Sequence, residues 1–484
     1  MDNTTDRNKK IKDGISRRSF LKYMGIGAAA ATVLPGCATG KDEAGDIPEP
    51  EKKGDMTYRV NHNTGDRVSL LGYGCMRLPT VSGESAQRSD SEIDQEKVNA
   101  QVDHCLKYGV NYFDTSPAYC RGLSEQAMGK ALSRHPRNSY FIATKLSNFD
   151  PSTWPREKSI EMFENSLKYL QTEYVDYLLL HSIGGSSDEL SSMDTYKARY
   201  EDNGILDWLI EQKEKGRIRN LGFSYHGDIK IFDHLLSQMD EGRLNWDFVQ
   251  IQHNYVDWQY ADKINDRNTK SEYLYAELEK RNIPAVIMEP LLGGRLADVP
   301  YGIAAKMKQR RPNDSVASWA FRYAGSMPGV LTVLSGMTYD EHINDNIKTF
   351  SPLEPLTDDE YAFLQDSADK IVFNDTIPCT ACAYCMPCPY GVDIPAVFEH
   401  YNKCLNEENV PQSTRDENYT KARRVFLGSY DRAMASNRNA SRCIGCGHCV
   451  SHCPQAIPIP EKMHEIDGYV THLRANNFDI EAKV

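Results

Sequence analysis

The sequence predicts an α/β protein, in which a closed (β/α)8 barrel precedes a small, mainly α-helical domain. Two observations lead to this prediction. Between residues 57 and 356, a short apolar or β-branched run recurs eight times, and each run precedes a segment with helical periodicity. Beyond residue 357 the chain carries eight of its thirteen cysteines in two short clusters. We therefore assign residues 57–356 to the barrel and residues 357–484 to a helical domain.

Length and composition agree with this arrangement. The chain has 484 residues, of which 40% are hydrophobic, so it can bury a core of ordinary size. Its formal net charge is -12, and the acidic excess is spread along the chain. This charge disfavours nucleic acid as a partner and predicts a soluble surface.

The first 37 residues are predicted to be a targeting segment that is not part of the folded domains. Residues 16–22, SRRSFLK, precede an apolar run that is too short to span a bilayer. The segment resembles a twin-arginine signal peptide, which implies that the twin-arginine translocase reads Arg17 and Arg18 and exports the folded chain. We expect a periplasmic location or one on the outer side of the membrane. Cys37 lies in a sequence that resembles a lipobox, and acylation there or ordinary cleavage nearby both stay open. Residues 38–56 read as a flexible linker.

The strands are predicted in order along the barrel. A hairpin around residues 63–65 comes first, and the eight runs follow at 68–74, 110–114, 140–145, 175–181, 218–224, 248–253, 284–289 and 330–335. Eight alternations fit a closed parallel barrel, whereas a doubly wound sheet needs fewer. Because such barrels hold their chemistry at the C-terminal ends of the strands, polar residues at these ends are site candidates.

Four ionisable residues lie at three adjacent strand ends. Asp114 ends the second strand, Tyr119 follows in its loop, Lys145 ends the third strand and His181 ends the fourth. Reduction of a carbonyl by hydride needs a proton donor and a polarising partner on the same oxygen. We expect Tyr119 to donate the proton with its pKa lowered by Lys145, Asp114 to hold Lys145, and His181 to orient the oxygen. Separate salt bridges and a core histidine are the alternative.

Together these residues resemble the catalytic tetrad of the aldo/keto reductase family. The resemblance extends over residues 57–350 and implies a TIM barrel, oxidoreductase activity and a small carbonyl or alcohol substrate. It is carried by the motifs FDTSPAYCRGLSEQAMGKAL, GRIRNLGFS, FVQIQHNY, EPLLGGRL and SGMTYDEHINDNI, which occur in the family's order.

The same resemblance implies a site for NAD(P). Ser224 and Gln250 would hold the nicotinamide carboxamide, while Asp345 and Asn346 would meet the adenine end of the dinucleotide.

The sequence also departs from the family at this site. Met288 stands where many members stack a tyrosine on the nicotinamide, and Tyr225 replaces the usual asparagine after the carboxamide serine. Gly336 and His342 stand where the family places cations against a 2′-phosphate. The dinucleotide site is therefore altered, and we expect no strong preference for the phosphorylated coenzyme.

Two cysteine runs indicate two [4Fe-4S] clusters. Residues 443–454 resemble the bacterial ferredoxin run C-x2-C-x2-C-x3-C-P, and residues 379–389 have the same form with one residue fewer before the last cysteine. Zinc is the alternative, but three thiolates within seven residues, repeated and followed by Cys-Pro, fit a cubane better than zinc knuckles. The predicted ligands are Cys379, Cys382, Cys385, Cys388, Cys443, Cys446, Cys449 and Cys453.

By analogy with ferredoxins, each cluster would take three ligands from one run and the last cysteine of the other run. The polar segment 389–442 between the runs has a largely helical pattern. This half of the chain therefore resembles a mainly α-helical ferredoxin-like domain.

The leading hypothesis is an exported oxidoreductase whose two clusters relay electrons to or from a redox partner protein or a membrane electron carrier. An electron-transfer or binding subunit with a lapsed barrel is the alternative. The altered Met288, Tyr225 and Gly336 favour that alternative, and the intact tetrad argues against it. A cytosolic reductase with structural clusters is a third hypothesis, which the export signal disfavours. No loop indicates the substrate.

Overall fold

The computed structural model describes residues 47–185, 190–372, 374, 376–453 and 455–476. The predicted signal peptide, Cys37 and residues 38–46 of the predicted linker lie outside these residues. The described residues belong to one compact unit, Asp46–Val484. Among the helices within this part of the chain, none is both long and apolar enough to cross a membrane.

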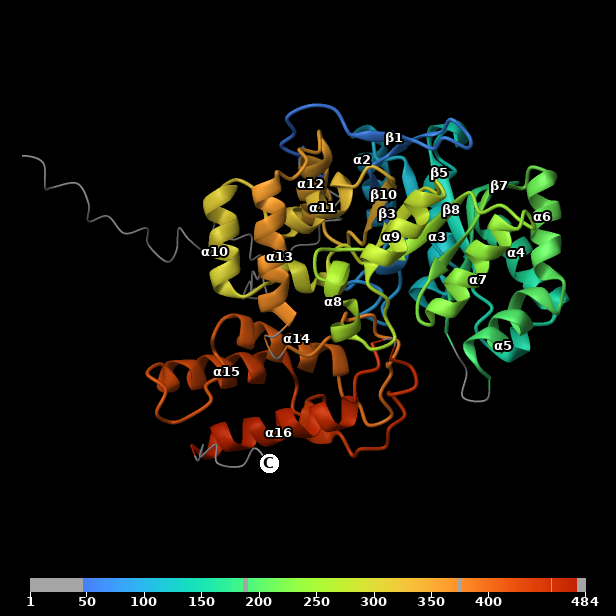
Figure 1. Cartoon of the computed structure of the whole chain (residues 1–484). Coiled ribbons are helices and arrows are strands. Elements are labelled where there is room, and N and C mark those ends of the chain that lie inside the picture. Colours follow the sequence, from blue (N-terminus) through green and yellow to red (C-terminus); the bar gives the residue numbers. More distant parts are fainter. Residues whose placement is uncertain (1–46, 186–189, 373, 375, 454, 477–484) are drawn as a thin grey trace, which may run out of the picture. The chain divides into compact units, whose positions relative to one another are not determined.

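The predicted closed barrel is confirmed (Figure 1). Eight parallel strands close in the order β10-β3-β4-β5-β6-β7-β8-β9. The strands are β3 (Leu71–Gly74), β4 (Tyr112–Asp114), β5 (Phe141–Leu146), β6 (Val175–Ile183), β7 (Ile218–Tyr225), β8 (Phe248–Gln252), β9 (Ala285–Met288) and β10 (Val330–Ser335).

The first predicted strand, 68–74, is wrong as a single element. Its start belongs to β2 (Arg67–Ser69), which pairs antiparallel with β1 (Tyr58–Val60) in a separate hairpin, and only β3 enters the barrel. The backbone changes partners at Leu70, whose N–H donates to the Thr57 carbonyl while its own carbonyl accepts from Val333. A continuous apolar run hides this change because both segments are buried.

Helices follow the strands as predicted (Figure 1). Helix α2 is typical: Val98, Val102 and Cys105 form its buried stripe, and the Asp94 side chain caps its first turn by accepting from the Lys97 N–H. The barrel helices are α2 (Gln95–Lys107), α3 (Ser124–Leu132), α4 (Arg156–Leu170), α6 (Ile205–Glu214), α7 (Ile229–Asp240), α9 (Ser271–Lys280), α11 (Val316–Ser326) and α12 (Asp340–Phe350). Shorter insertions are α5 (Ser192–Tyr196), α8 (Asp257–Ile264) and α10 (Tyr301–Arg310).

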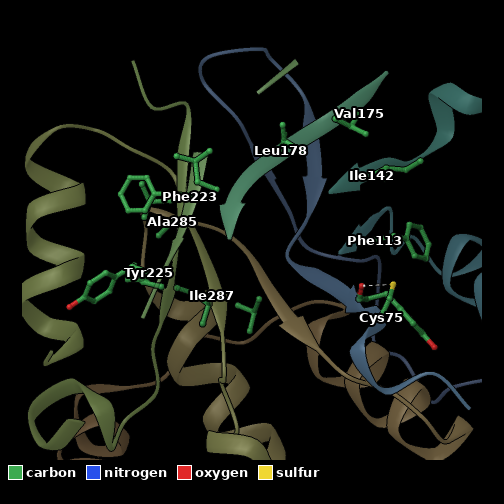
Figure 2. Packing of buried hydrophobic residues seen from close by; sticks show 14 of the residues in the cluster. Cys75, Phe113, Ile142, Val175, Leu178, Phe223, Tyr225, Ala285 and Ile287 are labelled. Carbon is green, nitrogen blue, oxygen red and sulfur yellow. Dashed lines mark hydrogen bonds between the residues drawn. The ribbon is translucent and has the colours of Figure 1, made fainter. Parts of the chain in front are cut away.

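Side chains of the strands alternate between two apolar layers. Tyr112 and Leu179 belong to a cluster inside the barrel. Their neighbours Phe113 and Leu178 belong to the larger layer between strands and helices, part of which Figure 2 shows. Because successive residues of a strand point to opposite faces, the parity of a position decides whether it faces the barrel interior.

In the described residues from 376 to 476, the second domain has the three α-helices α14 (Ile394–Asn406), α15 (Tyr419–Ala433) and α16 (Ile459–Ala475). The helical pattern read from segment 389–442 is therefore confirmed. Val397, Phe426 and Met463, one from each helix, are fully buried in the core of this domain. Helix α13 (Asp358–Val372) lies beyond the predicted boundary at residue 356 but packs through Phe363 and Leu364 with barrel-side residues such as Trp319.

Residues 47–56 differ from the flexible linker that we expected. Ile47 and Met56 are buried, and the Pro48 carbonyl accepts from the Asn344 side chain. The backbone N–H groups of Lys53 and Gly54 donate to the Ser351 carbonyl. Apolar side chains scattered through a polar segment give no periodicity, which is why the sequence did not indicate this packing.

Two helical glycines should respond in opposite directions to alanine. A Cβ at Gly129 of α3 would stand 2.0 Å from the Tyr169 carbonyl oxygen at the end of α4, so Gly129→Ala should destabilise the protein by about 3 kcal/mol. A Cβ at Gly302 of α10 would meet nothing within 4 Å, so Gly302→Ala should stabilise it by up to about 1 kcal/mol. Urea denaturation followed by circular dichroism measures both, and a shared sign would contradict the packing of α3 on α4.

Candidate active site

Strand parity brings the predicted catalytic residues to one place. Asp114 is two residues beyond Tyr112, and His181 is two residues beyond Leu179, so both continue the inward-facing series of their strands. Lys145 follows Ala143 in the same way. All three therefore face inward above the apolar interior, at the C-terminal mouth of the barrel.

Asp114 and Lys145 form a buried ion pair. The Lys145 Nζ is 2.5 Å from Asp114 Oδ1 and also donates to the Thr115 carbonyl at 2.9 Å. Both side chains are buried, with 3% or less of each exposed. Burial raises the pKa of the Asp114 carboxyl, and the neighbouring ammonium opposes that rise. The second carboxyl oxygen, Oδ2, has no hydrogen-bond partner among the described residues.

Tyr119 lies beside this pair, but the predicted direction of its pKa shift is wrong. Burial raises the pKa of Tyr119 well above its ordinary value, and the charge of Asp114 adds to the rise. The Lys145 Nζ stands over the face of the ring, 4.7 Å from its centroid, and its charge is matched by Asp114. The Tyr119 hydroxyl therefore keeps its proton near neutral pH, as a proton donor must.

His181 faces the same space as a neutral ring. Its Nδ1 is 2.6 Å from the Ser147 hydroxyl, and its ring centroid is 6.0 Å from that of Tyr119. Burial lowers the pKa of His181 well below its ordinary value, and Lys145 and Arg199 add to the effect. If Ser147 donates to Nδ1, the ring proton is on Nε2, which suits a hydrogen bond to a carbonyl oxygen.

Of the two residues predicted to hold the carboxamide, Gln250 has an unpaired polar atom, whereas the Ser224 hydroxyl already accepts a hydrogen bond. The Ser224 hydroxyl accepts the N–H of Ser182, at an irregularity in the pairing of β6 with β7. Gln250 Nε2 lies 3.4 Å from Met288 Sδ, while its buried Oε1 has no hydrogen-bond partner among the described residues. This unpaired amide oxygen fits a donor such as the NH2 of a carboxamide. Tyr225 is one residue beyond Ser224 in β7 and so points to the opposite face of the strand. Its hydroxyl forms hydrogen bonds with Gly227 and Thr269, away from the site.

The predicted adenine-end residues lie along the same cavity. Asp345 accepts from the Ser315 hydroxyl, and Asn346 donates to the Ser335 hydroxyl. Burial lowers the pKa of His342, so this ring carries no charge near neutral pH. A Cβ at Gly336 would stand 3.0 Å from Arg77 Cδ, so glycine there lets the Arg77 stem pass.

One cavity of about 1000 Å³ joins the barrel mouth to the second domain. Tyr119, His181 and Gln250 line it together with Cys379, Cys382 and Cys453. Asp114, Ser224, Met288, Gly336, Asp345 and Asn346 also line it, so these predicted coenzyme residues and most of the tetrad share one space. Lys145 lies beneath the surface, behind Tyr119 and Asp114.

Three further residues of this cavity were missed by sequence reasoning. Glu289 directly follows β9, so the rule used for the tetrad, polar residues at strand ends, points to it, whereas Arg77 ends the short turn Cys75–Arg77 that follows β3. Burial raises the pKa of Glu289, which Arg77 opposes. Tyr384 comes from within the first cysteine run, and no spacing rule indicates it. It is 44% exposed and lines the cavity close to Tyr119 and Cys382.

The eight clustered cysteines fall into two groups of four. Cys453 is a neighbour of Cys379, Cys382 and Cys385, and Cys388 is a neighbour of Cys449 together with Cys443 and Cys446. Each group therefore combines three thiols of one run with the last thiol of the other, which is the grouping that the ferredoxin analogy implied. No set of three or more described histidine, cysteine or acidic residues is arranged to hold a metal ion directly. The case for clusters rests on this grouping and on the local backbone.

The two runs share one backbone shape. Positive φ angles flank the second cysteine of each run, at Ala381 (49°) and Ala383 (60°) around Cys382, and at Gly445 and Gly447 (both 75°) around Cys446. Glycine adopts this region freely, whereas alanine loses roughly 1–2 kcal/mol there. The first run keeps the shape at this cost, which fits a loop that must wrap a bulky group bound by its thiols.

The first cysteine run is fixed to the barrel mouth. Arg77 Nη2 donates to the Thr380 carbonyl at 2.9 Å, and a Cβ at Gly293 would stand 2.3 Å from Thr380 Cα. Arg295 adds a hydrogen bond to the Thr376 hydroxyl. Gly293, in the loop after β9, is therefore required for close approach of the two backbones.

Comparison with known protein families agrees with both halves of the chain. The model of the aldo/keto reductase family matches residues 70–369, and that of the 4Fe-4S dicluster domain matches residues 378–457. Two curated relatives cover the barrel. L-galactose dehydrogenase of Arabidopsis thaliana is 26% identical over 322 residues, which are 63% of this chain and 91% of the relative. The oxidoreductase YqkF of Bacillus subtilis is 24% identical over 334 residues, 63% and 94% of the two chains.

Among solved structures, the holo form of the aldo-keto reductase AKR11C1 from Bacillus halodurans is similar to this chain. It has a TM-score of 0.50 and 24% sequence identity, and the match covers 66% of this chain and 99% of that one. This likeness supports the barrel fold.

The buried ion pair allows a double-mutant test. Lys145→Met should destabilise the protein by about 3–5 kcal/mol at pH 8, because the Asp114 carboxylate stays buried without a partner. The loss should shrink towards pH 5, because Asp114, with its raised pKa, then takes up a proton in the folded state. Lys145→Met combined with Asp114→Asn should cost less than Lys145→Met alone.

The exposed Lys158–Glu161 pair is the matched control. Lys158→Met should cost less than about 1 kcal/mol in the same urea denaturation assay. Equal losses for Lys145→Met and the double variant would show that Asp114 is not a buried charge.

Proposed function

The chain belongs to the aldo/keto reductase family, and we propose that it is an exported oxidoreductase that reduces a carbonyl or oxidises an alcohol at the barrel mouth, with electrons relayed by two [4Fe-4S] clusters. The single cavity lined by Tyr119, His181, Cys379 and Cys382 is the main support. It gives the proton donor and the thiols of the first run access to the same space.

The chain's own residues would manage the proton and the oxygen. Reduction of a carbonyl to an alcohol consumes two electrons and two protons. Tyr119 would give its hydroxyl proton to the developing alkoxide, and neutral His181 would hold the same oxygen by a hydrogen bond. Asp114 and Lys145 would keep the Tyr119 ring in place, since the ammonium lies over its face. In alcohol oxidation the same groups act in reverse.

The eight grouped thiols would be the cluster ligands, four to each cluster. Such clusters exchange electrons one at a time, and that is the chemistry they would supply when bound. Cys379, Cys382, Cys385 and Cys453 would hold the cluster next to the cavity.

A tightly held dinucleotide is compatible with the same cavity. Gln250 offers an unpaired amide oxygen for a carboxamide. A strong preference for the phosphorylated form is not expected, because His342 is neutral, Gly336 has no side chain, and the Arg77 guanidinium already donates to Thr380. We propose that such a dinucleotide would stay bound between turnovers and be recharged through the clusters, so that turnover needs no free coenzyme.

An anaerobic assay tests the relay. Reduced methyl viologen and a test aldehyde are supplied without added coenzyme to protein carrying about eight irons per chain. Tyr119→Phe should lower aldehyde reduction by at least about 100-fold, because the proton donor is lost, while cluster bleaching persists. Cys382→Ser should damage a cluster and lower the same activity, with Tyr119 intact.

Two controls complete this assay. Cys404→Ser, which removes a buried cysteine outside both groups, should keep the iron content and the activity. Full activity of Cys382→Ser with methyl viologen would mean that the clusters are structural, whereas iron-loaded parent protein with no activity towards any aldehyde would favour a lapsed barrel. Colourless protein with stoichiometric zinc would contradict both clusters.

Export has its own test. Replacing Arg17 and Arg18 by Lys should leave the chain in the cytoplasm, as measured by cell fractionation, because the twin-arginine translocase reads this pair. Loss of lipid labelling in Cys37→Ser would identify an anchor there. An unchanged location of the double variant would remove the twin-arginine hypothesis.

A further inference from the structure

The two cysteine groups occupy different positions relative to the cavity. Cys379, Cys382 and Cys453 of the first group line it, and we call Cys379, Cys382, Cys385 and Cys453 the inner group. None of the described lining residues is Cys388, Cys443, Cys446 or Cys449, which we call the outer group. Cys446 of the outer group is exposed to solvent.

Three exposed apolar side chains flank cysteines of the outer group in the sequence. Ile444 is 60% exposed, Tyr390 48% and Val450 40%, and each lies within two residues of an outer-group cysteine. Exposed apolar side chains gathered around one feature typically mark an interaction site. We define the outer face by Tyr390, Arg442, Ile444, Cys446 and Val450.

The charge near this face is positive. Segment 432–452 contains three arginines and no aspartate or glutamate, although the whole chain has a net charge of -12. Arg438 pairs with Asp393, whereas the exposed Arg442 has no ion pair within the described part of the chain. His448 and His452 are also exposed on this segment. Helix α16 contributes Glu461 and Glu465 beside His464, and Glu465 pairs with Lys462.

From these observations we infer that the outer face docks a small acidic electron-transfer protein, which exchanges electrons with the outer group. The inference rests on the proposed function, and it orders the relay: partner, outer group, inner group, cavity. Each encounter passes one electron from the reduced partner, so two encounters supply one carbonyl reduction and the two protons come from Tyr119 and solvent.

Complementary charge explains how such a partner would find the face. Opposite charges raise association rates more than they raise final affinity, and the effect weakens with salt. Apolar side chains at the centre with arginine beside them are also the usual composition of a transient interface. Arg442 should therefore govern the encounter rate.

The test uses an acidic flavodoxin as the probe. Cluster bleaching by reduced flavodoxin is followed by stopped flow at low ionic strength and expressed relative to bleaching by reduced methyl viologen, which needs no docking. Arg442→Glu should lower this ratio by about tenfold or more and flatten its salt dependence. Arg415→Glu, an exposed arginine outside segment 432–452, should change it less than twofold. Calorimetric titration with oxidised flavodoxin should show the same order in Kd.

The outcomes separate this inference from the proposed function. Equal ratios for Arg442→Glu and Arg415→Glu would overturn the docking face alone. Faster bleaching by a quinol in liposomes than by flavodoxin, with the same dependence on Arg442, would replace the protein partner by a membrane carrier and overturn the inference. Parent protein that methyl viologen cannot bleach would overturn the proposed function, and the inference with it.

Discussion

Closure of the parallel barrel determines where the site residues point, because each residue of a strand faces either the barrel interior or the surrounding helices. The inward series Tyr112–Asp114 and Leu179–His181 places charged groups directly above an apolar interior. That interior is why Asp114 and Lys145 must pair, and why His181 stays neutral. A slip of one residue in either strand would point the predicted catalytic side chain towards the surrounding helices.

The sequence predicted this constraint better than its electrostatic consequences. Apolar or β-branched runs located the strands, and polar residues at their ends located Asp114, Lys145 and His181. The pKa of Tyr119 could not be predicted, because it depends on where the Lys145 ammonium points in three dimensions. The break at Leu70 was missed for a related reason, since a change of hydrogen-bond partner leaves no trace in hydrophobicity.

For the second domain, the sequence indicated which cysteines group together but not how the domain contacts the barrel. Analogy with ferredoxins suggested that three thiols of one run group with the last cysteine of the other run, and in the structure these thiols are neighbours. What spacing could not indicate is which group meets the barrel. That depends on a contact between two backbones, Gly293 against Thr380, and on one side chain, Arg77, that crosses Gly336 to reach the same loop. Such long-range contacts have no local signal.

This contact also bears on the departures from the family at the coenzyme site. Gly336 looks like a lost phosphate ligand in the sequence, yet in the structure it is the space through which the Arg77 stem passes. Arg77 in turn holds Thr380, next to Cys379. A larger side chain at position 336 would crowd the Arg77 stem, which holds the cysteine loop. The predicted coenzyme site and the first cysteine run are thus linked in the structure through one side chain, Arg77.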